Sequence, residues 1–252
     1  MRFYHRYGVH LSYLKGHWMT TKVDAATHHE FEYDERYFQS YGKRKTSIDD
    51  IYTRYLNWAG LIDGEGKTAL DIGAAFGYVV DLLQRFGYSA YGVDISPFAC
   101  SKSEDVICGS AETPPFKENF FDLVTCFETI EHLPQADMAL ARFNGLLRKH
   151  GTLIFTTPTP FGEKVHRRFL PHYPYYSDDK GSKPTDADYH AHHPSLRECR
   201  IWINALSSAG FVNIKCRQFI LTPIILRKYR VLPSLSMSAT HMLIRAEKHE
   251  SD

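Results

Sequence analysis

Long apolar runs are absent from this sequence, and so is the apolar core of a signal peptide at the amino terminus. No stretch approaches the roughly 20 apolar residues that a membrane-spanning helix needs. Paired cysteines are also lacking: the five cysteines show no Cys-x-x-Cys spacing, and an odd number is awkward for a disulfide framework. These absences argue against a membrane or secreted protein, and we expect a protein of the reducing cytoplasm.

An excess of either charge sign is lacking too, since the formal net charge is +1. Nothing global therefore draws the chain towards nucleic acid or an anionic membrane. The amino-terminal segment, residues 1–47, differs locally because no acidic residue precedes Asp24. We expect this basic, aromatic arm to be either a surface-draped terminus or a lid that faces the substrate. Its basic residues before Asp24 are Arg2, Arg6, Lys15 and Lys22.

Internal repeats and long low-complexity tracts are absent, so the chain divides by its periodicity and its turn signals. Its 43% hydrophobic and 23% charged residues are typical of a globular protein rather than a disordered one. With 252 residues, the chain has room for a single α/β domain with an insertion. We therefore expect one folded domain.

Short β-rich runs alternate with helical stretches along the middle of the chain. Such alternation is typical of a parallel, doubly wound sheet with right-handed crossovers. We predict an α/β, Rossmann-like fold with a mostly parallel seven-stranded sheet and helices on both faces. The expected strands are 68–72, 90–93, 106–108, 122–127, 152–157, 212–219 and 241–246.

Helix starts and an insertion complete the predicted organisation. Ser47 with Asp50, and Ser195 with Glu198, resemble capping boxes ahead of apolar helical faces. After the fifth strand, prolines and a dense set of His and Tyr break the alternation, which indicates an inserted cap. The predicted segments are an arm (1–47), a core (48–160), a cap (161–194) and a carboxyl-terminal helix with two strands (195–252).

A glycine turn follows the first core strand and carries the most specific signal. The strand ends in Asp71, and small residues then lead into a helix, so the backbone can pass close to a ligand. The next strand ends in Asp94, where a carboxylate can accept hydrogen bonds from ribose hydroxyls. Together these features indicate a nucleoside-containing ligand. The small residues of the turn are Gly73, Ala74, Ala75 and Gly77.

This Asp-x-Gly-x-x-x-Gly turn lacks the Gly-x-Gly-x-x-Gly of dinucleotide-binding proteins. The sequence instead resembles the class I S-adenosylmethionine (SAM)-dependent methyltransferases, especially the methyltransferase type 11 branch with the ubiquinone-biosynthesis O-methyltransferases. The resemblance covers about residues 48–160. It implies that SAM is the cofactor, with Asp71, Gly73 and Gly77 around its methionine part.

The resemblance assigns further positions to the cofactor. Asp94 would hold the ribose hydroxyls, and Ile95 would pack on the adenine. A later turn would meet the adenine amino group, although Ser110 replaces the acid that is usual there and Ala111 could contact it through the backbone. The remaining candidates are Glu112 in the same turn and Phe127, which with Cys126 would line the sulfonium side.

A Glu-Thr-Ile-Glu-His string follows the fourth strand, at the sheet edge where open α/β folds bind ligands. If Glu128 begins a helical turn, Glu131 and His132 lie with it on one face. Two carboxylates and an imidazole could bind Mg²⁺, Mn²⁺, Fe²⁺ or Zn²⁺. The string resembles one that is associated with metal binding in ubiquinone-pathway O-methyltransferases and in small-RNA terminal 2′-O-methyltransferases.

The second of these groups also resembles this chain in a later His-x-His string. A fourth ligand could come from His192, or from its neighbours His190 and His193. Other roles stay open. His132, with Glu131, could act as a metal-free general base, or the pair could form hydrogen bonds that fix the loop. The later histidines could instead belong to the surface or the structure of the cap.

The methyl acceptor is the least specified part of the chemistry. Because the sulfonium of SAM already activates the methyl group, the protein must mainly align a nucleophile and exclude water. We predict transfer to a hydroxyl or amine of a small molecule, such as a sugar, an aromatic or a lipid-linked intermediate. An RNA 2′-O-methyltransferase is the alternative, although the weak net charge and the lack of an RNA-binding module oppose it. A non-catalytic SAM-binding protein is a third reading.

Overall fold

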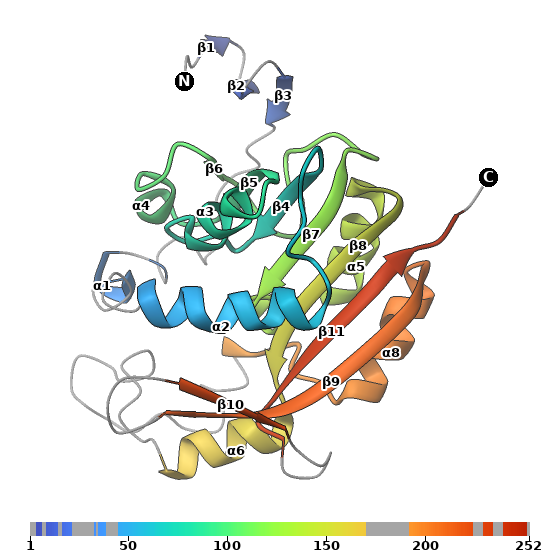
Figure 1. Ribbon diagram of the computed structural model, residues 1–252. Coiled ribbons are helices and arrows are strands. Elements are labelled where there is room, and N and C mark those ends of the chain that lie inside the picture. The colour runs from blue at the N-terminus through green and yellow to red at the C-terminus, as the bar shows by residue number, and fades with distance from the viewer. Residues whose placement is uncertain are drawn as a thin grey trace.

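A computed structural model describes residues 4–6, 9–14, 17–21, 33, 35–38, 45–169, 192–223, 229–233 and 239–250. This part of the chain forms an eight-stranded main sheet with helices, and a separate three-stranded sheet near the amino terminus (Figure 1). The strands are β1 (Tyr4–Arg6), β2 (Val9–Leu14), β3 (His17–Thr21), β4 (Thr68–Ile72), β5 (Ser89–Asp94), β6 (Val106–Cys108), β7 (Phe121–Phe127), β8 (Leu147–Pro158), β9 (Phe211–Pro223), β10 (Tyr229–Pro233) and β11 (His241–Lys248). The helices are α1 (Glu35–Phe38), α2 (Lys45–Trp58), α3 (Tyr78–Arg85), α4 (Pro97–Cys100), the 3-10 helix η3 (Ile130–His132), α5 (Ala136–Leu146), α6 (Pro160–Phe169) and α8 (Cys199–Ser208).

The strand order of the main sheet is β10-β9-β11-β8-β7-β4-β5-β6. Strands β4 to β8 pair in parallel, whereas β11 pairs antiparallel with β8 and with β9. From β4 the chain moves outwards to β5 and β6, and it then crosses back to β7 on the other side of β4. A crevice at the carboxyl ends of these strands is where such sheets bind ligands.

The predicted fold class is confirmed, and each of the seven expected strands forms within the described residues. The pattern was informative because the parallel strands β4 and β7 are buried on both faces and are therefore rich in apolar residues. Strand β10 was not expected. It pairs antiparallel with the end of β9 and makes an eighth strand at the edge of the sheet.

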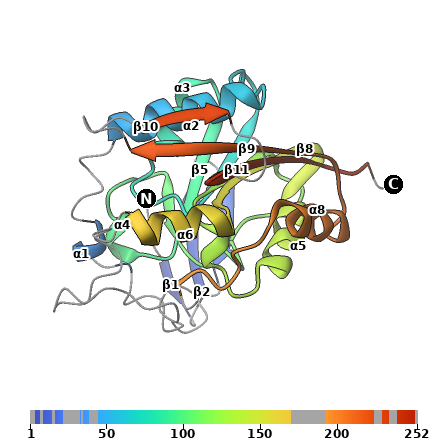
Figure 2. The same ribbon diagram turned by 90° about the horizontal axis from the view of Figure 1, so that it is seen from below.

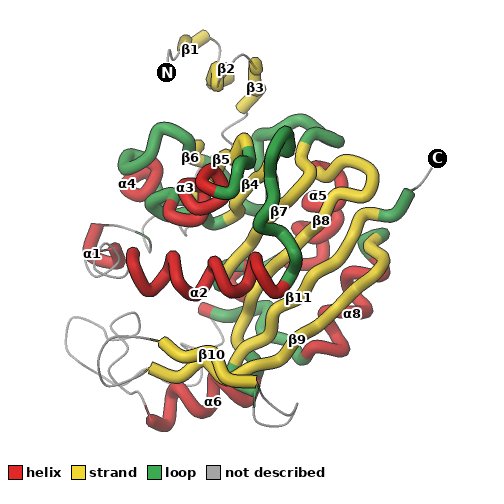
Figure 3. The backbone as a smooth tube through the Cα atoms, viewed as in Figure 1, coloured by secondary structure: helices red, strands yellow, loops and turns green. Residues whose placement is uncertain are grey.

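Helices cover both faces of the main sheet. Figure 2 shows α2 and α3 on one face and α5 and α8 on the other, and Figure 3 shows these helices in red against the yellow strands. Alternate side chains of β4 belong to different cores, one on each face of the sheet. Leu70 and Ile72 pack with Trp202 of α8, while Ala69 packs with Tyr55 of α2. The sheet therefore has one apolar core on each face.

Both predicted capping boxes are wrong. Helix α2 begins at Lys45, so Ser47 lies inside the helix rather than before it. Helix α8 begins after Glu198, without a side-chain cap. The hydroxyl of Ser195 instead donates to the carbonyl of Leu133 at 2.6 Å, which ties the chain before α8 to the loop after η3.

The predicted cap and arm are described only in part. The cap begins with a helix, α6. Residues 170–191, which include the candidate ligand His190, lie outside the described residues. In the arm, strands β1 to β3 form a small antiparallel sheet that was not expected. A bridge between Cys199 and Cys216, which the cysteine spacing did not suggest, joins α8 to β9. Within the described ranges, no helix is both long and apolar enough to cross a membrane.

Candidate active site

The glycine turn between β4 and α3 packs directly against the loop that follows β7. Gly73 and Gly77 have positive φ angles of 74° and 78°, and Ala75 adopts 46° between them. A Cβ atom on Gly73 would lie 2.2 Å from Oγ1 of Thr129. Glycine is therefore required at position 73, both by its left-handed backbone and by the close approach of Thr129.

Asp94, at the end of β5, joins the turn to the neighbouring strand. One carboxylate oxygen accepts from the amide of Ala75 and the other from the amide of Ser96, both at 2.8 Å. The amides of Gly73 and Ala74 donate to the carbonyl of Val93. The turn and Asp94 thus form one rigid edge, and each oxygen of Asp94 retains a lone pair for a ribose hydroxyl.

Asp71 lies beneath this edge and is almost fully buried. The hydroxyl of Thr125, its register partner on β7, donates to its carboxylate at 2.6 Å. Burial raises the pKa of Asp71 to about 7; the Thr125 hydrogen bond opposes the rise and the charge of Asp94 adds to it. A direct contact between Asp71 and the methionine part of SAM stays a prediction.

The raised pKa of Asp71 predicts that stability falls as pH rises. Between its ordinary pKa of 3.8 and about 7, folded Asp71 keeps a proton that the unfolded chain has lost. The free energy of unfolding therefore decreases with pH across this window, by about 1.4 kcal/mol per pH unit for one proton. Buried Asp94 and Glu131 add slopes of the same sign, because their pKa values are also raised.

Denaturant titrations at pH 5, 6 and 7 test this prediction. Asp71→Asn should reduce the slope of unfolding free energy against pH, because the amide carries no titrating proton. The matched control is Asp63→Asn at an exposed loop position, which should leave the slope unchanged. A slope that is identical in the wild type and in Asp71→Asn contradicts the assignment.

The other cofactor candidates lie around the same edge but make structural contacts. The hydroxyl of Ser110 accepts from the amide of Glu112, whose own carboxylate accepts from the amide of Gln135 at the start of α5. Phe127 stacks on Tyr52 of α2, with ring centroids 4.6 Å apart. Their roles in binding SAM stay predictions. Ala111 packs on the core, and the carbonyl of Ile95 accepts from the thiol of Cys108.

A group of three possible metal ligands lies at the loop that follows β7. Glu131, His132 and His193 each offer an atom within 4.8 Å of the others. Glu131 is 1% exposed, and its Oε2 atom has no hydrogen-bond partner among the described residues. Burial raises its pKa well above the ordinary value, and the charge of Glu128 raises it further. A buried carboxylate in this state needs a proton or a cation.

His132 is held in one orientation. Its Nδ1 lies 2.8 Å from the carbonyl oxygen of His192, which can only accept, so Nδ1 carries the proton. Nε2 therefore keeps its lone pair. Burial, with a smaller contribution from His193, lowers the pKa of His132 to about 3. A neutral imidazole with a fixed tautomer suits a metal ligand better than an unaided general base, whose pKa should lie near the working pH.

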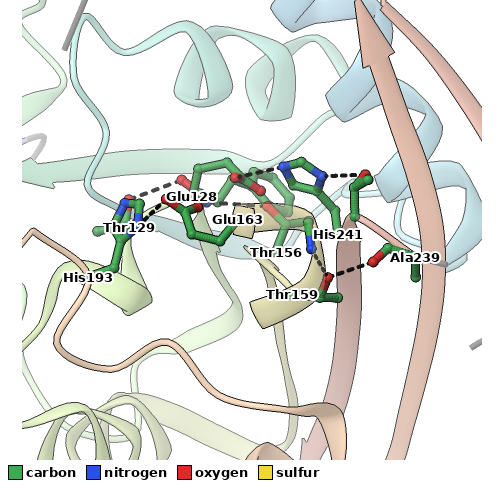
Figure 4. Close-up of polar contacts among 11 residues, drawn as sticks. Glu128, Thr129, Thr156, Thr159, Glu163, His193, Ala239 and His241 are labelled. Atoms are coloured by element: carbon green, nitrogen blue, oxygen red, sulfur yellow. Dashed lines mark hydrogen bonds and ion pairs between the residues drawn. The ribbon is translucent and has the colours of Figure 1, made fainter. Parts of the chain in front are cut away.

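Glu128 does not share a helical face with Glu131 and His132, so that expectation is wrong. Its φ angle is +49°, and the 3-10 helix begins only at Ile130. Figure 4 shows its carboxylate next to His241 of β11, with Oε2 3.5 Å from Nε2 of the imidazole. Glu128 stands beside the three-residue group and raises the negative charge there.

The segment after the cap supplies the third member of the group. The predicted ligand His192 contributes its backbone carbonyl, whereas the side chain of the next residue, His193, joins Glu131 and His132. The amide of Ser195 donates to the carbonyl of Glu131 at 3.1 Å. These bonds dock the segment on η3, and the His132 and His193 rings lie 4.6 Å apart.

Two nearby residues were missed at the sequence level, Glu163 and Tyr33. Glu163 lies in the first turn of α6, and its carboxylate is 3.4 Å from Nδ1 of His193 (Figure 4). The sequence Thr159-Pro160 was a usable signal for this helix, since Thr is favoured at the N-cap and Pro at the first helical position. No sequence signal links Glu163 to His193, because the pairing is tertiary.

Tyr33 connects the arm to Ser96, next to Asp94, and to His132 after β7. Its backbone carbonyl accepts from the Ser96 hydroxyl at 2.5 Å, and its ring meets the edge of His132 at 6.5 Å between centroids. Phe38 of α1 packs on Phe76 in the glycine turn. These contacts bring Tyr33 and Phe38 of the arm beside the site, and both interpretations of the arm stay predictions.

Comparison with known proteins identifies the family. Residues 38–215 match the family described as a methyltransferase domain. The chain belongs to this family. The resemblance to class I SAM-dependent methyltransferases is thereby confirmed at the level of the family.

Curated relatives match this chain over part of their length. The ubiquinone biosynthesis O-methyltransferase of Methylococcus capsulatus is 28% identical over 103 residues, which cover 36% of this chain and 44% of that protein. The protein of the same name in Pseudomonas paraeruginosa is 28% identical over 128 residues, covering 44% and 53%. The chain thus spans about half the length of the curated relatives it matches.

Solved structures share the fold of this methyltransferase at low identity. A SAM-dependent methyltransferase of Thermotoga maritima, described as a possible histamine N-methyltransferase, has a TM-score of 0.63 and 19% identity and covers 87% of this chain and 98% of its own. A SAM-dependent methyltransferase of Archaeoglobus fulgidus has a TM-score of 0.59 and 17% identity, with coverage of 85% and 100%. At these identities the similarity supports the fold alone.

Proposed function

We propose that this methyltransferase transfers the methyl group of SAM to a hydroxyl of a small molecule, beside a divalent cation. The proposal rests on one observation: the side chains of Glu131, His132 and His193 come together beside the loop that packs against the glycine turn. A hydroxyl needs help to lose its proton, whereas an amine acceptor needs little. A built cation site next to the donor turn therefore favours a hydroxyl acceptor.

The residues present fit a cation. Oε2 of Glu131 is buried without a hydrogen-bond partner among the described residues, and Nε2 of His132 keeps a lone pair that a cation could accept. Two imidazoles and one carboxylate favour Zn²⁺, Fe²⁺ or Mn²⁺ over Mg²⁺, which prefers oxygen ligands. Three protein ligands leave coordination positions open. A bound cation would supply a Lewis acid that lowers the pKa of the acceptor hydroxyl and orients it.

On the donor side, the protein's own residues bind and orient SAM. The oxygens of Asp94, fixed by the amides of Ala75 and Ser96, would accept from the ribose hydroxyls. The glycine turn allows the backbone to pass close to the methionine part. Because this edge is rigid, the sulfonium would lie at a defined distance from the loop that carries Glu131.

On the acceptor side, charge balance and exclusion of water matter most. Burial and the charge of Glu128 raise the pKa of Glu131, so a cation there would compete with a proton for the carboxylate. The Tyr33 ring lies against His132 and its backbone against Ser96, where it would cover the path between donor and acceptor. Water excluded in this way cannot compete with the acceptor hydroxyl.

A labelling screen with metal removal tests the proposal. SAM with a radiolabelled methyl group is incubated with the enzyme and either small-molecule extracts or short RNAs, before and after chelation. We expect label in small molecules, a loss on the order of 10- to 100-fold after chelation, and recovery on adding Mn²⁺ or Zn²⁺. Chelator-insensitive labelling would remove the cation from the proposal.

The RNA arm of the same screen separates the second reading. Label in RNA 3′ ends, without label in small molecules, would favour the RNA 2′-O-methyltransferase alternative. SAM binding by calorimetry, without label in either extract, would favour the non-catalytic reading. The net charge of +1 gives no support to RNA as the substrate.

A further inference from the structure

We propose that Glu163 is a positioning residue that holds His193 by its Nδ1 atom, so that Nε2 faces Glu131 and His132. The inference rests on the proposed function, because the cation is part of that proposal. Glu163 Oε1 lies 3.4 Å from Nδ1 of His193. Glu163 belongs neither to the Glu-x-x-Glu-His string nor to the later group of histidines.

The position of Glu163 is fixed by the start of α6. The hydroxyl of Thr159 accepts from the amide of Gly162 at 2.8 Å and donates to the carbonyl of Ala239 at 2.6 Å. The amide of Glu163 donates to the carbonyl of Thr159 at 2.9 Å. Thr159 therefore caps the helix and also anchors it to the segment before β11 (Figure 4).

Close packing leaves α6 little room to shift. A Cβ atom on Gly162 would lie 2.0 Å from the carbonyl oxygen of Thr240. The backbone of the first helical turn is thus in direct contact with the chain that leads into β11. Glu163 is the next residue, so this packing fixes the position from which its side chain extends.

Burial separates this pair from an ordinary surface contact. The side chains of His193 and Glu163 are 7% and 10% exposed. His150 and Glu250 form a pair at the same 3.4 Å distance, but their side chains are 69% and 64% exposed. A buried carboxylate and imidazole keep their geometry because water does not compete, whereas a solvated pair contributes little.

The arrangement repeats what the structure does with His132. In both histidines Nδ1 lies near an acceptor: that of His132 is hydrogen-bonded to the carbonyl of His192, and that of His193 lies 3.4 Å from the carboxylate of Glu163 without hydrogen-bond geometry. Histidine ligands in metal sites are held in this way, and loss of the outer partner commonly weakens the metal by 10- to 100-fold. The 3.4 Å separation would shorten once a cation on Nε2 made the Nδ1–H group a stronger donor.

The experiment combines a tautomer measurement with metal titration. Nitrogen-15 NMR of the metal-free protein reports which nitrogen of His193 carries the proton, and titration with Co²⁺ reports affinity and, by its d–d absorption, coordination. The variants are Glu163→Leu, which removes the acceptor, and Glu163→Gln, which keeps an acceptor oxygen and removes the charge. Glu250→Leu is the matched control.

We expect the Nδ1–H tautomer of His193 in the wild type and the Nε2–H tautomer in Glu163→Leu. Co²⁺ should bind 10- to 100-fold more weakly to Glu163→Leu, with Glu163→Gln between the two, and the saturated spectrum should keep its form. Glu250→Leu should match the wild type in both measurements. The spectrum is informative because an unchanged form means unchanged direct ligands.

Three results would overturn the inference. They are an Nε2–H tautomer in the wild type, equal Co²⁺ affinity in the wild type and both Glu163 variants, and a d–d spectrum that loses a ligand in the variants. The last would make Glu163 a direct ligand. Failure of the wild type to bind Co²⁺ would instead count against the proposed cation, and the tautomer measurement would still decide the role of Glu163.

Discussion

Glu131→Gln is expected to reduce methyl transfer by at least about 100-fold while leaving SAM affinity within about twofold of the wild type. The amide has the shape of the carboxyl group but lacks its charge, so it is a poor partner for a cation. Glu131 lies on the loop after β7, away from the Asp94 edge that would hold the ribose. Loss of turnover should therefore separate from loss of donor binding.

Stability should not confuse this result. Burial raises the pKa of Glu131 well above its ordinary value and so favours the neutral form, which glutamine resembles. We expect the melting temperature of Glu131→Gln to equal or exceed that of the wild type. The measurements are initial rates with labelled SAM, calorimetric SAM binding and thermal unfolding.

The control for this substitution is Glu118→Gln, which removes a carboxylate from an exposed pair with Arg142. Its rate and its SAM affinity should both match the wild type. Turnover of Glu131→Gln at the wild-type level would exclude Glu131 from the chemistry. Loss of SAM affinity in that variant would mean that the two halves of the site are coupled more closely than their separate loops suggest.

Gly73→Ala is expected to weaken SAM binding by more than about tenfold and to destabilise the fold. The substitution adds a Cβ atom where φ is +74° and where Oγ1 of Thr129 would be 2.2 Å away. The left-handed backbone costs roughly 1–2 kcal/mol, and overpacking costs about 1–3 kcal/mol more. Relief of the clash would move the turn away from the loop, which distorts the donor edge.

Gly66→Ala is a closely matched control for this prediction. Its φ angle is +73°, and a Cβ atom there would meet no atom within 4 Å. It should show the backbone cost alone and keep SAM affinity. Adding Thr129→Gly to the Gly73→Ala chain should recover part of the affinity, because it removes the clashing atoms. Equal losses in the two alanine variants would contradict the role of the Thr129 contact.

The strands of the main sheet were predictable because their burial is local in sequence. Strands β4 and β6 have the predicted bounds, whereas β8 extends beyond its predicted bounds at both ends, from Leu147 to Pro158. Strand β10 was missed; it pairs only with the end of β9, at the edge of the sheet.

The helix starts were less predictable, because a hydroxyl can satisfy partners far along the chain. Ser195 matched a capping pattern, yet its hydroxyl donates to Leu133 in another loop. Thr159 does cap a helix, but the surrounding prolines and histidines made that region read as an irregular insertion. Local spacing alone did not distinguish these two cases.

The sequence was enough to predict the donor turn and the pair Glu131–His132, since in both the residues are neighbours along the chain. Only the tertiary structure decided what joins that pair. The positive φ of Glu128 turns it towards His241, and docking of the segment after the cap brings in His193 instead of His192. Glu163 meets His193 because α6 packs on the chain before β11. Contacts between such distant segments depend on packing and burial, which residue spacing does not encode.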